Sequence, residues 1–389
     1  MICIVSTHSP LSSGFGGIAR TTGHYLAAFN KLRIPVELIA SSASSNGKVS
    51  AAALRHAYPN VTPHLFTPTF SRRWGIGFGF LKFLPVIRRS SLLIVQSTRT
   101  FPTVIAGLTA RAFRKKYYVV THASTDVSLS KYTAAKRPVI YPLVLPFVLS
   151  SVRGAAALIV AGESEQRNLL PQLHAMSVIQ IENFFEFDKS QVTSRHLQDD
   201  KTYLFAGRIA PDKGINSFCR AWIEAAGPTS RLLIAGTGRG TYFEEFVAIA
   251  MSDSRIKYLG ELPEEKLRDV MENSSIVVVP TGLDHDVSES FGNVVVEAFI
   301  AGRPVMAAKG LHWDRYADNP AIIRFDRDKR SVQSAIRSFE MLAEGEYLGM
   351  SRSAAALAAN FHLDAALEKL SALCNGLVAN TETQASPSS

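Results

Sequence analysis

The chain has 389 residues, of which 47% are hydrophobic, and its formal net charge is +9. This length exceeds one ordinary hydrophobic core and predicts two domains of roughly 150–200 residues each. No apolar run reaches the roughly 18 residues that cross a bilayer, and three scattered cysteines argue against a disulfide framework or a zinc site.

Short apolar segments alternate with helical patterns along the whole chain. The expected strands begin at residues 2, 36, 92, 117, 157 and 177 in the first half, and at 203, 231, 256, 275, 304 and 321 in the second. Helical patterns, such as 17–32 and 103–116, separate them. This alternation predicts parallel, doubly wound sheets that are covered on both faces. Residues 1–10 lack a basic stretch before their apolar run, so we expect a first strand there and not a signal peptide.

One long polar stretch, residues 188–201, interrupts this alternation and is typical of a domain linker. We therefore predict a first domain over residues 1–188, a linker over 189–201 and a second domain over 202–379. Whether the last helix packs back on the first domain stays open. Residues 380–389 are polar and are expected to form a disordered tail.

Positive charge is concentrated in the first half of the chain. Residues 1–190 contain 21 Lys and Arg against 7 Asp and Glu, and no acidic residue lies between Glu37 and Asp126. Aromatic residues are interleaved with this basic interval, which suits an anionic membrane face or a diphosphate-bearing acceptor. A core helix with a solvated basic face and a nucleic-acid surface are the alternatives. The apolar run 141–154, which Pro142 and Pro146 interrupt, is expected to be a buried helix.

In the second half, candidate binding residues follow the strands. The first strand is followed by Gly207 and Arg208, and then by Lys213 before the next helix. Arg208 and Lys213 could reach the same anion, the arginine as a fork and the lysine as a point charge. The next strand is followed by Gly236 and Gly238, which let the backbone approach a nucleotide closely or simply form a turn.

The most specific pattern is a pair of carboxylates, Glu289 and Glu297, eight positions apart. Glu289 follows a strand and a polar loop, and a Phe291-Gly292 turn leads into the helix that carries Glu297. The N–H groups of a helix N-terminus favour anions, typically phosphate. Carboxylates that accept hydrogen bonds suit a ligand rich in hydroxyls. A nucleotide-activated sugar has both parts. The nearby Asp284-His285-Asp286 is expected to be a solvated loop.

The segments GRIAPDKG, ESFGNVVVE and AGRPVMA resemble the retaining GT-B glycosyltransferases that carry an E-x7-E motif, which are family four or glycosyl transferases group one. The resemblance is strongest from Tyr203 to Ala308. In the first half, SSGFGGIARTTGHYLAAF is similar to the glycine-rich first loop of this family, and THASTD to the segment that carries its cleft histidine. The resemblance implies an α/β fold of two Rossmann-like domains with parallel sheets that face one another across a cleft.

The resemblance also implies roles for individual residues. Arg208 and Lys213 would neutralise the donor diphosphate, Glu297 would bind the ribose hydroxyls, and Glu289 would position the transferred sugar. His122 would lie near the anomeric carbon. Donor or diphosphate contacts would come from the backbone around Gly16, Gly17, Gly207, Gly236, Gly238, Phe291, Gly292 and Asn293.

The resemblance implies a retaining enzyme, which we expect to move a sugar from a nucleotide-diphosphate donor to a saccharide or lipid-linked acceptor in surface polysaccharide biosynthesis. No metal or other cofactor is expected. The enzyme would be cytoplasmic, with peripheral contact to the inner face of the cell membrane through the basic first domain. One alternative is a nucleotide-sugar epimerase of the same fold, and another is a catalytically silent binding subunit. Nucleic-acid binding is disfavoured by the acidic second half.

Overall fold

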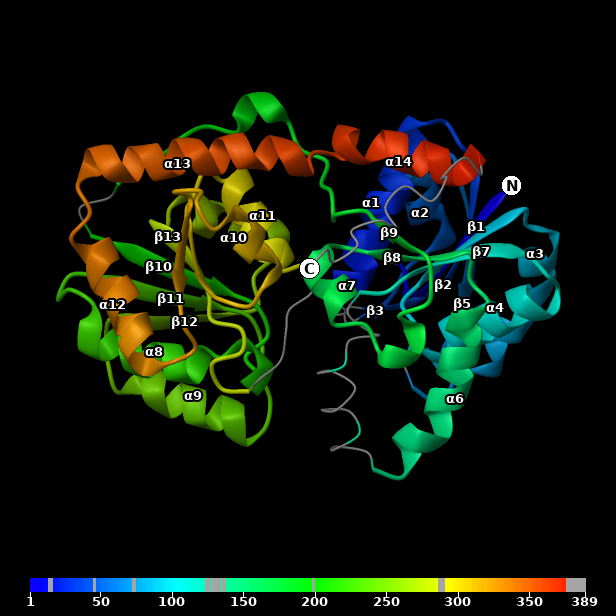
Figure 1. Cartoon of the computed structure of the whole chain (residues 1–389), viewed down its shortest axis with the longest axis horizontal. Coiled ribbons are helices and arrows are strands. Elements are labelled where there is room, and N and C mark those ends of the chain that lie inside the picture. The colour runs from blue at the N-terminus through cyan, green and yellow to red at the C-terminus, as the bar shows by residue number, and fades with distance from the viewer. Residues whose placement is uncertain are drawn as a thin grey trace, which may run out of the picture. The chain divides into compact units, whose positions relative to one another are not determined.

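The computed structural model describes residues 1–12, 17–44, 47–71, 75–122, 127, 134, 138–197, 200–285 and 291–375. Two compact units divide the chain: unit 1 comprises Met1–Glu186 with His362–Ser389, and unit 2 comprises Phe187–Phe361 (Figure 1). No helix in the described part of the chain combines the length and the apolar character that a bilayer crossing requires.

Unit 1 is built around a parallel sheet of seven strands in the order β5-β2-β1-β6-β7-β8-β9. The strands are β1 (Ile2–His8), β2 (Val36–Ser41), β5 (Val61–Phe66), β6 (Leu92–Gln96), β7 (Lys116–Val120), β8 (Ala157–Val160) and β9 (Val178–Gln180). A short hairpin, β3 (Ala43–Ser44) with β4 (Gly47–Lys48), lies outside this sheet. Six of the seven strands were predicted from the sequence; β5 was not.

Helices cover both faces of this sheet because consecutive strand residues point to opposite sides. Ile2 and Ile4 of β1 join the core under α1 and α14, whereas Cys3 and Val5 join the core under α3, α4 and α6. The unit contains helices α1 (Gly17–Lys31), α2 (Ala51–Ala57), α3 (Leu84–Arg89), α4 (Phe101–Ala112), α6 (Ile140–Arg153), α7 (Glu163–Arg167) and α14 (Leu363–Asn375), with 3-10 turns η1 (Phe78–Phe83) and η2 (Pro171–Leu173).

Unit 2 contains a parallel sheet of six strands in the order β12-β11-β10-β13-β14-β15. The strands are β10 (Thr202–Ala206), β11 (Arg231–Ala235), β12 (Ile256–Gly260), β13 (Ile276–Val279), β14 (Val305–Ala308) and β15 (Ile322–Phe325). The helices are α8 (Ile215–Ala225), α9 (Thr241–Met251), α10 (Glu264–Glu272), α11 (Asn293–Ile300), α12 (Lys329–Glu340) and α13 (Glu344–Ala358), with 3-10 turns η3 (Lys189–Gln191), η4 (Pro211–Lys213), η5 (His312–Tyr316) and η6 (Ala359–Phe361). All six strands were predicted.

The segment expected to be a linker is instead part of unit 2. The backbone N–H of Arg195 donates to the Ser351 hydroxyl over 2.7 Å, and the Arg195 side chain donates to Glu272 over 2.9 Å. A Cβ atom built on Gly302 would lie 2.0 Å from the carbonyl oxygen of Thr193, so the segment passes directly over that glycine. The polar composition of residues 188–201 reflects hydrogen bonds to unit 2 and not a tether.

The second domain also ends earlier than predicted, at Phe361 and not at 379. Helix α14 belongs to unit 1, where Leu363 and Leu370 are fully buried in the core that α1 covers. Lys31 at the end of α1 donates to Asp364 over 2.6 Å. The sequence had left the position of this last helix open.

Helix α6 corrects the expectation of a buried helix. Pro142 lies in its first turn, where a missing N–H costs little, and Pro146 lies inside the helix. Its buried residues are Val148, Leu149, Ser151 and Val152, all in its C-terminal half. The apolar side chains of its N-terminal half are exposed, so apolar composition does not mean burial here.

Candidate functional site

The loops at the C-terminal edge of the unit 2 sheet form the candidate site. The chain starts this sheet at β10 in its middle, proceeds outward to β11 and β12, and then crosses to β13 on the other side of β10. The connections that follow β10 and β13 therefore diverge to opposite faces. In open parallel sheets, such a switch point at the carboxyl ends of the strands is where ligands bind.

Gly207, Gly236 and Gly238 bring the first two loops of this edge together. Gly207 donates its N–H to the carbonyl of Ala235 over 3.0 Å, and Ile209 donates to Thr237 over 2.8 Å. A Cβ atom on Gly236 would lie 1.8 Å from the Gly207 carbonyl oxygen, and one on Gly238 would lie 2.8 Å from that of Ile209. The contact between the two loops therefore requires glycine at residues 236 and 238, whereas a Cβ atom on Gly207 would make only ordinary contacts with the Phe205 ring.

Arg208 extends from the end of β10, and its side chain is 62% exposed. Its guanidinium donates to the carboxylate of Asp212 over 2.7 Å, a partner that the sequence pattern did not indicate. Lys213 ends the 3-10 turn η4 directly before α8. The structure thus places both predicted cations on the loop after β10, where Arg208 forms an ion pair with Asp212.

The loop after β13 is attached to the loop after β10 by backbone contacts. Gly282 donates its N–H to the carbonyl of Asp212 over 3.2 Å. Gly214 has a φ of 70°, and a Cβ atom there would lie 2.1 Å from the carbonyl oxygen of Pro280. The loops that follow β10, β11 and β13 are therefore joined into one structure at the switch point.

Replacing Gly214 with alanine is expected to destabilise unit 2, because the methyl group would overlap the Pro280 carbonyl. Gly240 is the matched control, since it also has a positive φ of 72° but no atom lies within 4 Å of its Cβ position. Gly240→Ala retains the backbone strain without the overlap. We expect Gly214→Ala to cost about 2 kcal/mol more and to lower the melting temperature by a further ~4–8 °C. Equal melting temperatures for the two variants would contradict the contact.

The sequence predicted a solvated loop at Asp284, and this prediction is wrong for that residue. Helices α8 and α9 hold the Asp284 side chain. Its carboxylate accepts from the Tyr242 hydroxyl over 2.5 Å, and that hydroxyl accepts from the N–H of Asn216 over 3.1 Å. Burial and this hydrogen bond raise the pKa of Tyr242, so its hydroxyl remains a donor. Asp284 therefore fixes the loop after β13. Asp286 lies outside the described residues.

The turn before α11 is anchored by aromatic packing. Phe291 is buried, with its ring 4.9 Å from that of His312 and 5.2 Å from that of Trp313. Burial lowers the pKa of His312 to about 4, so this ring is neutral near pH 7. Gly292 follows with a φ of 75°, and Asn293 starts α11. The Phe291 side chain is thus a packing anchor of this turn and is not exposed to a ligand.

The two predicted carboxylates have different outcomes. Glu297 is half-buried in the second turn of α11, four residues after Asn293. Glu289 lies outside the described residues, as does Gly16 in the first half. Gly17 starts α1 immediately after that loop, and no atom lies within 4 Å of its Cβ position. The space at the Cβ position of residue 17 is therefore open.

In unit 1, His122 lies just beyond β7 with a positive φ of 45°. Its Nε2 atom lies 2.7 Å from Oε1 of Gln96, the last residue of β6. An amide oxygen only accepts, so His122 carries its proton on Nε2 and leaves Nδ1 as an acceptor. Burial lowers the pKa of His122 to about 4. Gln96 was not predicted as a site residue; a polar residue that ends a buried strand is the signal that could have indicated it.

Replacing Gln96 with glutamate is expected to raise the pKa of His122. A carboxylate at hydrogen-bond distance favours the imidazolium form, by roughly 1–3 pKa units, above the starting value of about 4. Titration of the histidine ring protons by NMR would measure the shift, with the resonance assigned from a His122→Gln variant. Gln191→Glu, at an exposed position of unit 2, is the control. An unchanged His122 titration would show that the ring is not controlled by Gln96.

The described residues contain no group of three or more His, Cys, Asp or Glu side chains that could hold a metal ion. Positive charge at the unit 2 edge comes instead from Arg208 and Lys213, together with the N-terminus of α11. This combination suits an anionic ligand part, and the half-buried Glu297 suits hydroxyl groups.

Sequence comparison finds glycosyltransferases that are similar to part of the chain. The family model described as Glycosyl transferases group 1 matches residues 200–326. An uncharacterized glycosyltransferase of Methanocaldococcus jannaschii is 31% identical over 112 residues, and a D-inositol 3-phosphate glycosyltransferase of Mycolicibacterium smegmatis is 38% identical over 117 residues. The chain spans about a quarter of the length of these curated relatives, 27% and 25% respectively.

Solved structures are similar over nearly the whole chain. Anabaena HepE in complex with UDP-glucose has a TM-score of 0.73 at 15% identity, covering 97% of this chain and 99% of its own. Sucrose-phosphate synthase of Thermosynechococcus elongatus has a TM-score of 0.72 at 16% identity, covering 98% and 99%. At such identities the likeness shows the fold, which is that of GT-B glycosyltransferases with two domains of parallel sheets and helices.

Proposed function

We propose that this chain is a retaining glycosyltransferase that moves a sugar from a nucleotide-diphosphate sugar to a saccharide or lipid-linked acceptor in surface polysaccharide biosynthesis. The observation that supports it best is the joined edge of unit 2, where the loops after β10, β11 and β13 meet beside Arg208. The match of residues 200–326 to group 1 glycosyl transferases lies over this same edge.

The donor would bind to unit 2. Arg208 and Lys213 would neutralise the diphosphate, and backbone N–H groups at Gly292 and Asn293 would add donors at the N-terminus of α11. Glu297 would accept hydrogen bonds from the ribose hydroxyls. Glu289 would hold hydroxyls of the transferred sugar. The acceptor would bind to unit 1, where the neutral His122 presents an acceptor nitrogen to a sugar hydroxyl.

Transfer would break the bond between the anomeric carbon and the diphosphate oxygen, and both electrons would pass to the departing phosphate. Preorganised positive groups stabilise that developing charge. The acceptor hydroxyl would attack the same face, and its proton would go to the leaving phosphate. This route requires no enzyme base and retains the configuration. Because Arg208 and Lys213 supply the positive charge, we propose that no metal is needed and that activity persists in EDTA.

A panel of sugar nucleotides tests the proposal. A donor present at 100 times its dissociation constant should stabilise the fold by about 2.7 kcal/mol, which a thermal-shift measurement detects. Incubation of the selected donor with candidate acceptors should then release the nucleoside diphosphate, and NMR of the product should show the anomeric configuration of the donor. An inverted product would exclude retention.

The same experiments separate the two alternatives. An epimerase would convert the donor into an epimer without any acceptor. A catalytically silent subunit would be stabilised by a donor and would release nothing with any acceptor.

We also propose that the chain works in the cytoplasm, peripherally attached to the inner face of the cell membrane. The basic composition of unit 1 supports this placement: Arg88 and Arg114 are exposed there, and Arg88 lies over the ring of the exposed Phe113 at 5.4 Å.

A further inference from the structure

We infer that the N-terminal half of α6 inserts into the surface of an anionic lipid bilayer and that Arg111 and Arg153 bind its phosphate headgroups. The inference deepens the proposed function by assigning the membrane contact to one element. The inference rests on the proposed function only in placing the acceptor at the membrane. The binding of α6 to lipid depends only on side chains of unit 1.

The apolar side chains of this half-helix are exposed in a continuous stripe. Its five members, Val139, Ile140, Leu143, Val144 and Phe147, are between 44% and 72% exposed. Their spacing of three to four residues places them along one side of the helix. Pro142 and Pro146 between them are exposed as well. A contiguous apolar surface of this kind on a water-soluble fold marks an interaction site.

Charge is absent from this stripe and present at its far end. No Asp, Glu, Lys or Arg occurs in residues 138–152, and Arg153 ends the helix with an exposed side chain. Arg111, from the last turn of α4, donates to the carbonyl and the hydroxyl of Ser150 over 3.1 and 2.8 Å. An apolar face that continues into a cationic end is typical of helices that lie in the membrane interface.

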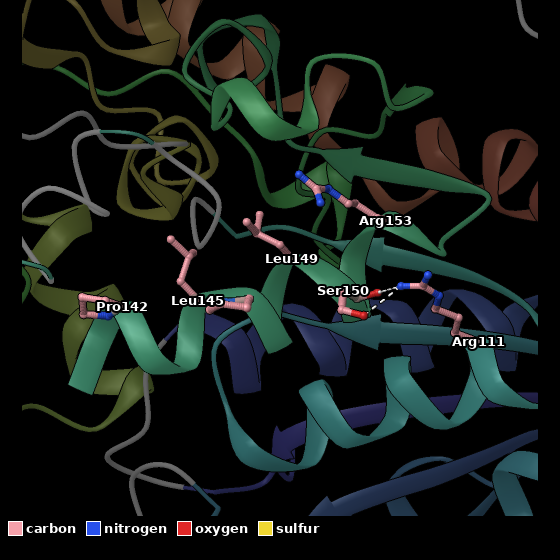
Figure 2. Close-up of a pocket in the computed structure, with 7 residues that line it drawn as sticks. Arg111, Pro142, Leu145, Leu149, Ser150 and Arg153 are labelled. Atoms are coloured by element: carbon pink, nitrogen blue, oxygen red, sulfur yellow. Dashed lines mark hydrogen bonds between the residues drawn. The ribbon is translucent and has the colours of Figure 1, made fainter. Parts of the chain in front are cut away.

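Both arginines line a pocket of about 430 Å³ along the side of α6 next to the stripe, whose other lining residues are Pro142, Leu145, Pro146, Leu149 and Ser150. Figure 2 shows Pro142, Leu145 and Leu149 along α6, with Arg153 farther along the same helix and Arg111 beside Ser150. The wall is therefore apolar toward the start of α6 and cationic toward its end. A phospholipid has the same order of parts, an acyl chain followed by a phosphate that bidentate guanidinium groups bind well.

A second copy of this chain is the other partner that could cover the exposed stripe of α6. A symmetric pair of α6 helices would bring the cationic ends of both copies into one interface, and no acidic residue lines the pocket that contains Arg111 and Arg153. A bilayer with anionic lipids complements both the stripe and the arginines. The charge distribution therefore favours the membrane.

The test is flotation of the full chain with vesicles of phosphatidylcholine alone or with 30% phosphatidylglycerol. We expect binding to the anionic vesicles, weakened by salt. A Leu143→Glu/Phe147→Glu variant should bind at least tenfold more weakly, and Arg153→Glu should lose the preference for anionic lipid. These side chains are exposed, so the melting temperature should not change. Met341→Glu is the matched control, because Met341 is an 84% exposed residue of unit 2.

Equal binding by the wild type and the Leu143→Glu/Phe147→Glu variant would overturn the inference. So would a wild-type dimer, detected by light scattering, that the same variant converts to a monomer, since the stripe would then be a contact between copies. Donor binding and transfer to a water-soluble acceptor are expected to survive in the variant. A wild type that transfers sugar but does not bind anionic vesicles would reject the inference about α6 alone, whereas vesicle binding without transfer from any sugar nucleotide would reject the proposed function alone.

Discussion

Replacing Arg208 with alanine is expected to lower the rate of sugar transfer by roughly ten- to a hundredfold or more. One charge-assisted hydrogen bond contributes about 1.5–3 kcal/mol, and the guanidinium can give two to a diphosphate. Negative charge grows on the leaving phosphate as the sugar departs, so the loss should appear mainly in kcat. Steady-state kinetics with the donor selected from the sugar-nucleotide panel would measure it.

Two further variants separate catalysis from support of the loop. Asp212 accepts from Arg208 over 2.7 Å, so Asp212→Ala removes that ion pair and leaves the arginine in place. If Arg208 acts on the donor, Asp212→Ala should retain most activity, whereas a purely structural role predicts equal losses. Arg208→Lys keeps the charge but not the fork, so an intermediate loss is expected. Arg231→Ala, an exposed residue paired with Asp200, should be neutral.

The local elements of this fold could be predicted because its strands are buried and apolar. The helix that follows the Phe291-Gly292 turn was expected from residue 293, and α11 starts at Asn293. Strand β5 was not predicted, since Pro63 interrupts it. The topology explains that exception: β5 is at the edge of the sheet, where a missing N–H does not break an interior ladder.

The contacts between loops could be predicted only in part. The glycine motifs indicated close backbone approach, but the approaching groups are other loops of the same sheet, such as the Gly207 carbonyl against Gly236. The partner of His122 is 26 residues away, on the neighbouring strand. Sequence separation conceals such pairs, because the register between strands decides which side chains meet.

Helix α6 and helix α14 show a different limit. The sequence of α6 is apolar and that of α14 is amphipathic, but neither pattern indicates which part of the protein packs against the helix. The buried half of α6 packs against α4, whereas the other half has an exposed apolar surface. Helix α14 follows unit 2 in the chain and yet completes the core of unit 1. Tertiary contacts decided both outcomes.

Replacing Glu297 with alanine is expected to weaken donor binding by ten- to a hundredfold, because its carboxylate would accept from the ribose hydroxyls at about 1.5–3 kcal/mol per bond. Unlike the loss at Arg208, this one should appear with the nucleoside diphosphate alone, before any sugar transfer. Isothermal titration of the nucleotide selected from the panel would measure it, and an unchanged melting temperature of the free protein would exclude a folding defect.

A nucleotide that lacks the ribose 2′-hydroxyl identifies the contact itself. The wild type should bind this 2′-deoxy nucleotide more weakly than the parent nucleotide. The Glu297→Ala variant should bind the two about equally, because it lacks the carboxylate that would accept from the 2′-hydroxyl. The coupling energy of this cycle, expected at about 1 kcal/mol or more, isolates the interaction between the carboxylate and the hydroxyl. Additive losses would mean that Glu297 acts on the site through α11 and not through the ribose.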